Sequence, residues 1–190
     1  MSSAAVILNP IAGSARGRLD GAGMRGLLGP LGIEAEVLPT GGAGEAVDLA
    51  ASAAERHPLV VVVGGDGTVS EVAKGLAGGP AAMAVIPCGS GNDFAQGLGI
   101  RSVADGIAAV AGGRERAVDT ASFADRFFVN SCGLFMNGEV SLRAAAVPRF
   151  WGKGRYPIAT LAEIFRRESV DATWRFETSD GPVTEQGEWT

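Results

Sequence analysis

The sequence predicts an α/β fold with a parallel sheet and helices on both faces, followed by the opening of a second, β-rich domain. Two observations support this prediction. Short apolar runs alternate with helical patterns up to about residue 113, which is typical of a parallel sheet covered on both faces. From about residue 118, predicted strands and turns dominate instead. We therefore expect an α/β domain over residues 1–117 and an incomplete β-sandwich domain over residues 118–190.

The first half of the α/β domain begins with residues 4–8, a short apolar run typical of a buried strand. A turn-rich segment follows, and residues 16–28 predict a weak helix because its glycines lower the helix propensity. Residues 33–38 predict a second strand. The alanine-rich residues 45–56 predict a helix after a glycine-rich loop.

The second half of this domain is organised around the apolar run at residues 59–63, which predicts a buried strand. Three glycines and an aspartate follow at residues 64–67, and the spacing of Thr68 and Glu71 predicts a capping box at a helix start. Residues 82–86 predict a further strand and residues 102–111 a further helix.

After residue 117, residues 118–122 and 126–132 predict two strands, and residues 156–167 predict an amphipathic helix. Apolar and polar residues alternate strictly over residues 170–177, which predicts a half-buried antiparallel strand with a return strand from residue 183. A lone hairpin is marginally stable and leaves an open edge. We therefore expect a longer second domain, or pairing of this edge in a homodimer.

The composition excludes several classes of protein. With 46% hydrophobic and 19% charged residues the chain should fold, and its net charge of −5 argues against nucleic acid as a partner. No apolar run approaches the roughly 18 residues that a transmembrane segment needs. We see no signal peptide either, so we expect a cytoplasmic protein.

Cysteine and histidine offer little chemistry. Cys88 and Cys132 lie far apart without a CxxC motif, which fits a reducing compartment and gives no zinc site. His57 is the only histidine and precedes Pro58, so we expect a helix-end or loop residue rather than a catalytic base.

Polar, glycine-rich loops follow the predicted strands at residues 9–14, 40–44, 64–68 and 89–93. Ligands of open parallel sheets bind at the carboxyl ends of the strands, where these loops could converge. The helix that begins near residue 68 would direct backbone N–H groups at this place, and such a helix start favours a phosphate. The alternative is that residues 64–67 form only a tight turn.

Asp66 and Thr68 each have two interpretations. The carboxylate of Asp66 either bonds to nearby N–H groups as a turn-former or meets Mg²⁺ that arrives with a nucleotide. Thr68 is either the helix N-cap or a phosphate ligand.

Basic and aromatic residues interleave over residues 148–156, which include Phe150 and Trp151. Such a stretch suits the surface of an anionic membrane. The alternative, which we favour, is a loop whose aromatic side chains pack under the second domain.

Three motifs together resemble the diacylglycerol kinase catalytic-domain family, which includes bacterial lipid kinases and sphingosine kinases. Residues 9–13 resemble an NPxxG motif, residues 64–68 a GGDGT motif, and residues 87–95 a PxGTxNDFA motif in which Ser90 replaces threonine. The GGDGT motif alone also occurs in NAD kinases, which have a similar fold. The other two motifs select the lipid kinases.

The resemblance implies an ATP-dependent lipid kinase that uses Mg²⁺ and meets its substrate, diacylglycerol first of all, at the inner face of a membrane. It implies a nucleotide site, with Asp66 also facing the metal, formed by Asn9, Pro10, Gly13, Thr40, Gly64, Gly65, Asp66, Gly67, Thr68, Glu71, Gly89, Ser90, Asn92 and Asp93.

No catalytic base is assigned, because the family's acidic base lies in a DG-containing motif later than this chain reaches; Asp180 and Gly181 come too early. Two alternatives to the lipid kinase remain. One is an NAD kinase, although no NxGxxGF-type motif follows Gly67. The other is a non-catalytic nucleotide-binding fragment.

Overall fold

The computed structural model describes residues 2–12, 19–123, 126–131, 138, 140, 142–143, 146, 155–166, 170–178 and 181–189. The chain forms two compact units, Met1–Asn130 and Ser131–Thr190. The first unit contains all the loops in which the sequence predicts ligand contacts. The domain boundary that the sequence predicts after residue 117 stays a prediction.

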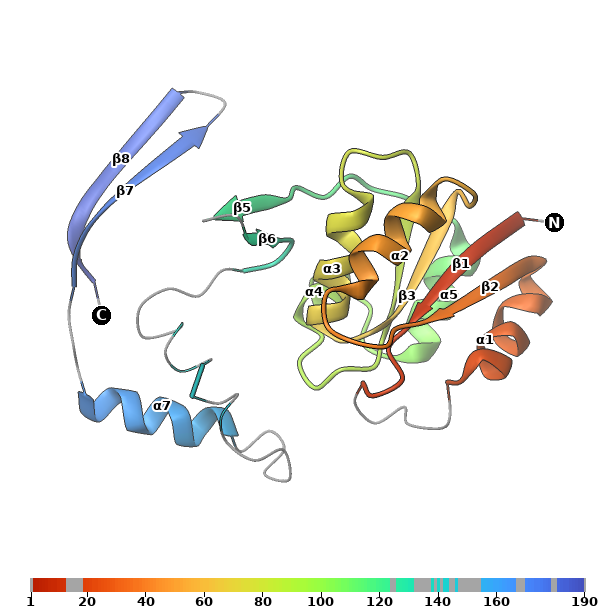
Figure 1. The fold of residues 1–190 in the computed structure, drawn as a ribbon, viewed down its shortest axis with the longest axis horizontal. Helices are drawn as coiled ribbons and strands as arrows, with labels where there is room; N and C mark the ends of the chain where they lie inside the picture. Colours follow the sequence, from red (N-terminus) through yellow and green to blue (C-terminus); the bar gives the residue numbers. More distant parts are fainter. Residues whose placement is uncertain are drawn as a thin grey trace. The chain divides into compact units, whose positions relative to one another are not determined.

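The first unit is built on a four-stranded parallel sheet in the order β2-β1-β3-β4 (Figure 1). The strands are β1 (Ser2–Leu8), β2 (Ile33–Pro39), β3 (Leu59–Gly64) and β4 (Ala82–Pro87). This confirms the predicted parallel sheet. The chain leaves β1 on one side to form β2 and returns on the other side to form β3, so the strand order reverses between β1 and β3.

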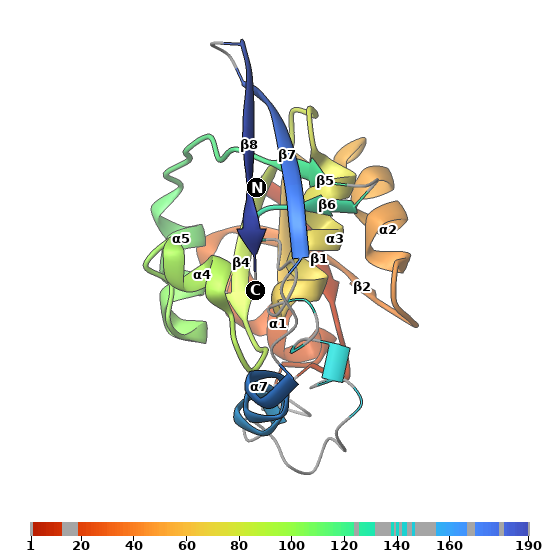
Figure 2. The same ribbon diagram turned by 90° about the vertical axis from the view of Figure 1, so that its left-hand side faces the viewer.

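Helices cover both faces of this sheet, as predicted (Figures 1 and 2). One face carries α2 (Glu45–Ala54) and α3 (Asp66–Leu76), which pack against each other. The other face carries α1 (Gly21–Leu28) and α5 (Val103–Gly112). The described residues of this unit also form two short helices, the 3-10 helix η2 (Gly29–Leu31) and α4 (Asp93–Gly97).

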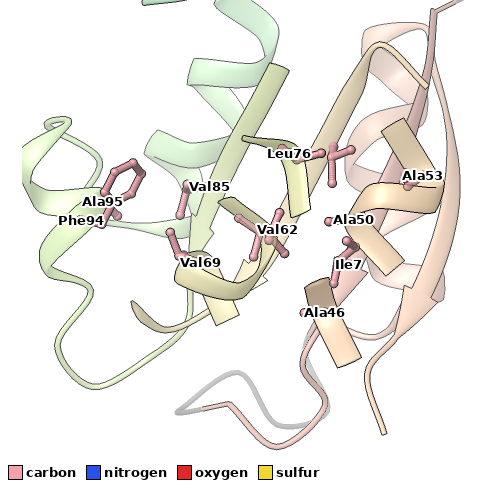
Figure 3. Close-up of a cluster of buried hydrophobic side chains, with 13 residues drawn as sticks. Ile7, Ala46, Ala50, Ala53, Val62, Val69, Leu76, Val85, Phe94 and Ala95 are labelled. Carbon is pink, nitrogen blue, oxygen red and sulfur yellow. The ribbon is translucent and has the colours of Figure 1, made fainter. Parts of the chain in front are cut away.

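The central strands are buried on both faces because successive side chains point to opposite sides of the sheet. Along β3, Val60 and Val62 join the cluster under α2 and α3, whereas Val61 and Val63 join the cluster under α1 and α5. Figure 3 shows the first cluster, in which alanines of α2 face Ile7 and Val62. The small alanines let α2 approach the sheet closely.

His57 lies between α2 and β3, where the sequence placed it, and its Nε2 is 2.6 Å from Glu36 Oε2. Arg56 also binds Glu36, at 3.1 Å. Glu36 lies in β2, and this cluster precedes β3, whereas the polar loops follow the strands. His57 therefore has no part in the candidate site.

A short antiparallel hairpin, β5 (Ala121–Phe123) with β6 (Arg126–Phe128), belongs to the first unit. It lies against α3, where the Ser70 hydroxyl donates to the Phe127 carbonyl over 3.4 Å (Figure 2). The turn at residues 124–125 lies outside the described residues.

The second unit contains α7 (Arg155–Arg166) and an antiparallel hairpin of β7 (Val170–Thr178) and β8 (Gly181–Trp189). Ala172 and Trp174 are half-buried while Asp171, Thr173 and Arg175 are exposed, which confirms the predicted alternation over residues 171–175. The proposed membrane contact at Phe150 and Trp151 lies outside the described residues. Among the helices that the structure describes, none is long and apolar enough to cross a bilayer.

Candidate functional site

The candidate site lies at the carboxyl ends of β1 and β3, where the strand order reverses. Crevices of this kind are where open α/β sheets bind ligands. A hydrogen bond crosses this point: Asn9 Nδ2 after β1 donates to Thr68 Oγ1 in α3 over 2.9 Å. The other end of the Asn9 amide is also fixed, because its Oδ1 accepts the Ile11 N–H at 3.1 Å.

Helix α3 directs its amino terminus at this crevice. It begins at Asp66, and its N-cap is Gly65, which has no side chain to accept from the first turn. The predicted capping box is therefore wrong: Thr68 lies inside the helix, bonded to Asn9, and Glu71 reaches a different loop. The missing cap leaves first-turn N–H groups without a side-chain acceptor from the N-cap, and an anion can take that place.

The loops after β3 and β4 touch through two glycines. A methyl group on Gly89 would stand 2.5 Å from Gly65 Cα and 2.8 Å from Asn92 Oδ1. Any side chain there would push the loops apart. Gly64 is as constrained, because a methyl group there would stand 2.7 Å from Thr68 Cβ.

Asp66 ties the same two loops together. Its Oδ2 accepts the Asn92 N–H at 2.8 Å, and its Oδ1 accepts the Phe94 N–H at 3.2 Å. Asn92 adopts a left-handed conformation with φ of +60°, and its side chain bonds both the N–H and the carbonyl of Gly89. Asp66 thus acts as the turn-former that one interpretation predicted, while its contact with Mg²⁺ stays a prediction.

The loop between β2 and α2 also lies at this edge of the sheet, beside the end of β1. Thr40 is buried, and its N–H donates to the Leu8 carbonyl over 2.8 Å, which joins this loop to the end of β1. Glu45 accepts the N–H groups of Gly41 and Gly42, and Glu71 accepts the N–H of Gly44 at 2.9 Å. Sequence reasoning missed Glu45, although an acid directly after a glycine-rich loop at a helix start was a usable signal.

The structure brings most predicted site residues to one edge of the sheet. Pro10 and Ser90 are exposed in the loops after β1 and β4, and Asp93 is exposed in the first turn of α4. Gly13 lies outside the described residues. A hollow of about 100 Å³ adjoins this edge, lined by Leu8, Asn9, Pro10, Ala12, Leu19, Asp20, Val63 and Cys88. Burial raises the pKa of the Cys88 thiol, so it is a poor nucleophile.

The residues at this edge fit a magnesium ion that arrives with phosphate groups. Within the described residues, no three histidine, cysteine, aspartate or glutamate side chains gather as a metal cage. Magnesium at phosphate sites commonly takes one or two carboxylates and completes its shell with phosphate and water. Two carboxylates of this kind lie on either side of Gly91: a methyl group on Gly91 would lie 3.0 Å from Asp66 Oδ2 and 3.5 Å from Asp93 Oδ1.

Comparison with known proteins finds a matching family profile and similar sequences. The sequence profile of the diacylglycerol kinase catalytic domain matches residues 3–123. The chain is 33% identical over 138 residues to the diacylglycerol kinase of Bacillus subtilis, covering 70% of this chain and 46% of that protein. It is 29% identical over 147 residues to a Chromohalobacter salexigens protein named "Probable lipid kinase YegS-like", covering 74% of this chain and 47% of that protein.

The fold is also that of a solved relative. The crystal structure of a diacylglycerol kinase from Bacillus anthracis superimposes with a TM-score of 0.67 at 23% identity, covering 97% of this chain and 61% of that chain. This likeness confirms the fold. The chain spans about half the length of the two curated relatives.

Proposed function

This chain belongs to the diacylglycerol kinase catalytic-domain family, and from that premise we propose that it forms the nucleotide-binding part of an ATP-dependent lipid kinase. In this proposal the γ-phosphoryl group of ATP passes to a lipid hydroxyl, with diacylglycerol as the acceptor met at a membrane surface. The observation that carries the proposal is the Asn9–Thr68 hydrogen bond at the place where the strand order reverses between β1 and β3. It lies beside the amino terminus of α3, whose N-cap has no side-chain acceptor.

The residues of the crevice suit phosphoryl transfer because this reaction depends on positioning and on electrostatic stabilisation. First-turn N–H groups of α3 offer donors to the phosphate oxygens, and the positive end of the helix dipole favours their charge. Thr68 Oγ1 accepts from Asn9, so its hydroxyl hydrogen is not used in that bond, and in this proposal it donates to the ligand. Mg²⁺, when bound, would neutralise part of the phosphate charge, with Asp66 and Asp93 as its protein partners.

The proposal has a direct binding test. MgADP or MgATP should stabilise the protein against thermal unfolding, by about 2.7 kcal/mol at a concentration near a hundred times the Kd. Asn9→Ala, which removes the hydrogen bond to Thr68 in α3, should weaken nucleotide binding, whereas Glu34→Ala at an exposed position of β2 should not. Absence of any nucleotide-dependent stabilisation would contradict the proposal.

Transfer is tested with radiolabelled ATP on dioleoylglycerol in mixed micelles, on sphingosine and on NAD. Label in phosphatidic acid supports the diacylglycerol kinase proposal, and label in sphingosine phosphate changes the acceptor. Label in NADP would instead favour an NAD kinase. If nucleotide stabilised the protein but no label passed from ATP to any acceptor, the chain would be a non-catalytic nucleotide-binding module.

A further inference from the structure

The loop at residues 40–44 is fixed by carboxylates from two different helices. Glu45 at the start of α2 accepts the N–H groups of Gly41 and Gly42, the latter at 3.2 Å. Glu71 in α3 accepts the N–H of Gly44 at 2.9 Å, across 27 positions of the chain. Hydrogen bonds to an ionised acceptor are stronger than neutral ones, so these contacts help to hold the exposed residues 41–44 of the loop in place.

Glu71 and Thr68 stand three residues apart and so lie on the same face of α3. Thr68 accepts a hydrogen bond from Asn9 in the loop after β1. Glu71 accepts one from the N–H of Gly44 in the loop after β2. The helix whose amino terminus faces the crevice therefore also sets the position of both neighbouring loops. Gly44 has a φ of +87°, a conformation that needs glycine, and it is the N-cap of α2.

We propose that Glu71 is a positioning residue for the nucleotide, which it orders through Gly44 and the 40–44 loop rather than by touching phosphate or Mg²⁺. The inference rests on the proposed nucleotide site and deepens it. A free carboxylate beside a polyphosphate would repel it, whereas Glu71 Oε1 is already engaged by a backbone donor. Thr40, which is buried and whose N–H is bonded to the end of β1, begins this loop and belongs to the proposed nucleotide site.

The test compares Glu71→Ala and Glu71→Gln with Glu55→Ala, which changes an exposed glutamate at the end of α2. Amide exchange of Gly44 is followed by NMR without nucleotide, and MgADP affinity is measured by calorimetry. We expect Glu71→Ala to speed Gly44 exchange and to weaken MgADP binding, each about five- to tenfold for a lost hydrogen bond. Glu71→Gln keeps an acceptor oxygen and should restore most of both, and Glu55→Ala should change neither.

Two results would overturn the inference. Unchanged Gly44 exchange in Glu71→Ala would show that the contact does not order the loop. If Glu71→Gln lost as much MgADP affinity as Glu71→Ala while its Gly44 amide exchange stayed normal, Glu71 would contact the nucleotide or its metal directly. If the unaltered protein binds no MgADP, the proposed nucleotide site fails, while the exchange experiment still decides whether Glu71 orders the loop.

Discussion

Gly67 lies in the first turn of α3, and a methyl group there would have no atom within 4 Å. Alanine favours a helix over glycine by about 1 kcal/mol, so Gly67→Ala should raise the free energy of unfolding slightly. The same methyl group would stand where the proposed phosphate approaches the backbone. We expect nucleotide affinity to fall while stability rises, which urea unfolding and calorimetry with MgADP would show.

Gly26 offers a matched control for this variant, because it lies inside α1 and is equally open. Gly26→Ala should gain similar stability and leave MgADP affinity unchanged. Equal affinity in both variants would mean that no ligand approaches the start of α3 at Gly67.

Glu36 makes the stability of the fold depend on pH. The bond with His57, and then that with Arg56, holds the pKa of Glu36 below its ordinary value of 4.5. Because the pKa is depressed in the folded state, the stabilisation is complete above pH 4.5 and is lost as the pH falls through the folded-state pKa. Glu36→Gln should therefore be less stable than the unaltered protein at neutral pH, and the difference should shrink in acid.

Urea unfolding between pH 3 and pH 7 measures this effect. Glu34→Gln, two residues earlier in the same strand and exposed, is the control and should run parallel to the unaltered protein. A constant difference between Glu36→Gln and the unaltered protein across this range would show that the Glu36 charge contributes nothing to folding.

The sequence predicted which residues gather at the site better than what each one does. Glycines and polar side chains after strands indicated the edge, because parallel strands end together. The hydrogen-bond partners depend on contacts between loops far apart in the sequence, which no local pattern contains. Thus the sequence limited Asp66 to two roles but did not identify Asn92 and Phe94 as its partners. Of the two interpretations of Thr68, the helix N-cap is wrong and the phosphate ligand stays a prediction.

At the scale of elements, helices α2 and α3 pack closely because Gly75 has no side chain. A methyl group at Gly75 would collide with the Val47 carbonyl and stand 2.9 Å from Ala50 Cβ. Gly75→Ala should lower the free energy of unfolding by about 1–3 kcal/mol despite its better helix propensity. Urea unfolding measures it, and stability equal to that of Gly26→Ala would show that the helices can separate without cost.

Strands and helices with a clear apolar run or a regular apolar pattern were predicted well. The four parallel strands and α2 agree with the predicted ranges to within two residues, and β7 fits its alternating pattern. The short helices η2 and α4 were not predicted, since three to five residues give no helical period. The start of α3 was placed too late because the glycine turn and the first helical turn share the same residues.

At the scale of the whole molecule, both buried clusters and the candidate site belong to the first unit. A protein of residues 1–130 should therefore unfold cooperatively and bind MgADP with the affinity of the whole chain. Calorimetry on both proteins, with circular dichroism as the check on folding, measures this. A folded 1–130 protein with much weaker binding would show that the second unit contributes to the nucleotide site.

The sequence pattern did not predict the order of the strands in the sheet. Alternating strands and helices predict a parallel sheet, yet the reversal between β1 and β3 depends on which side of β1 the chain crosses. That reversal creates the crevice. The sequence therefore predicted the class of fold and the edge of the sheet where the candidate residues gather, and the structure shows which strand ends bring them together.

The contact between Gly65 and Gly89 also affects how this protein can diverge. In a packed core, a larger residue on one side can be offset by a smaller residue opposite, and lineages drift through such exchanges. Neither glycine has a smaller residue to exchange for, so a change at one position has no compensating change at the other. New variants of this site can arise only through a shift of the backbone that carries both loops.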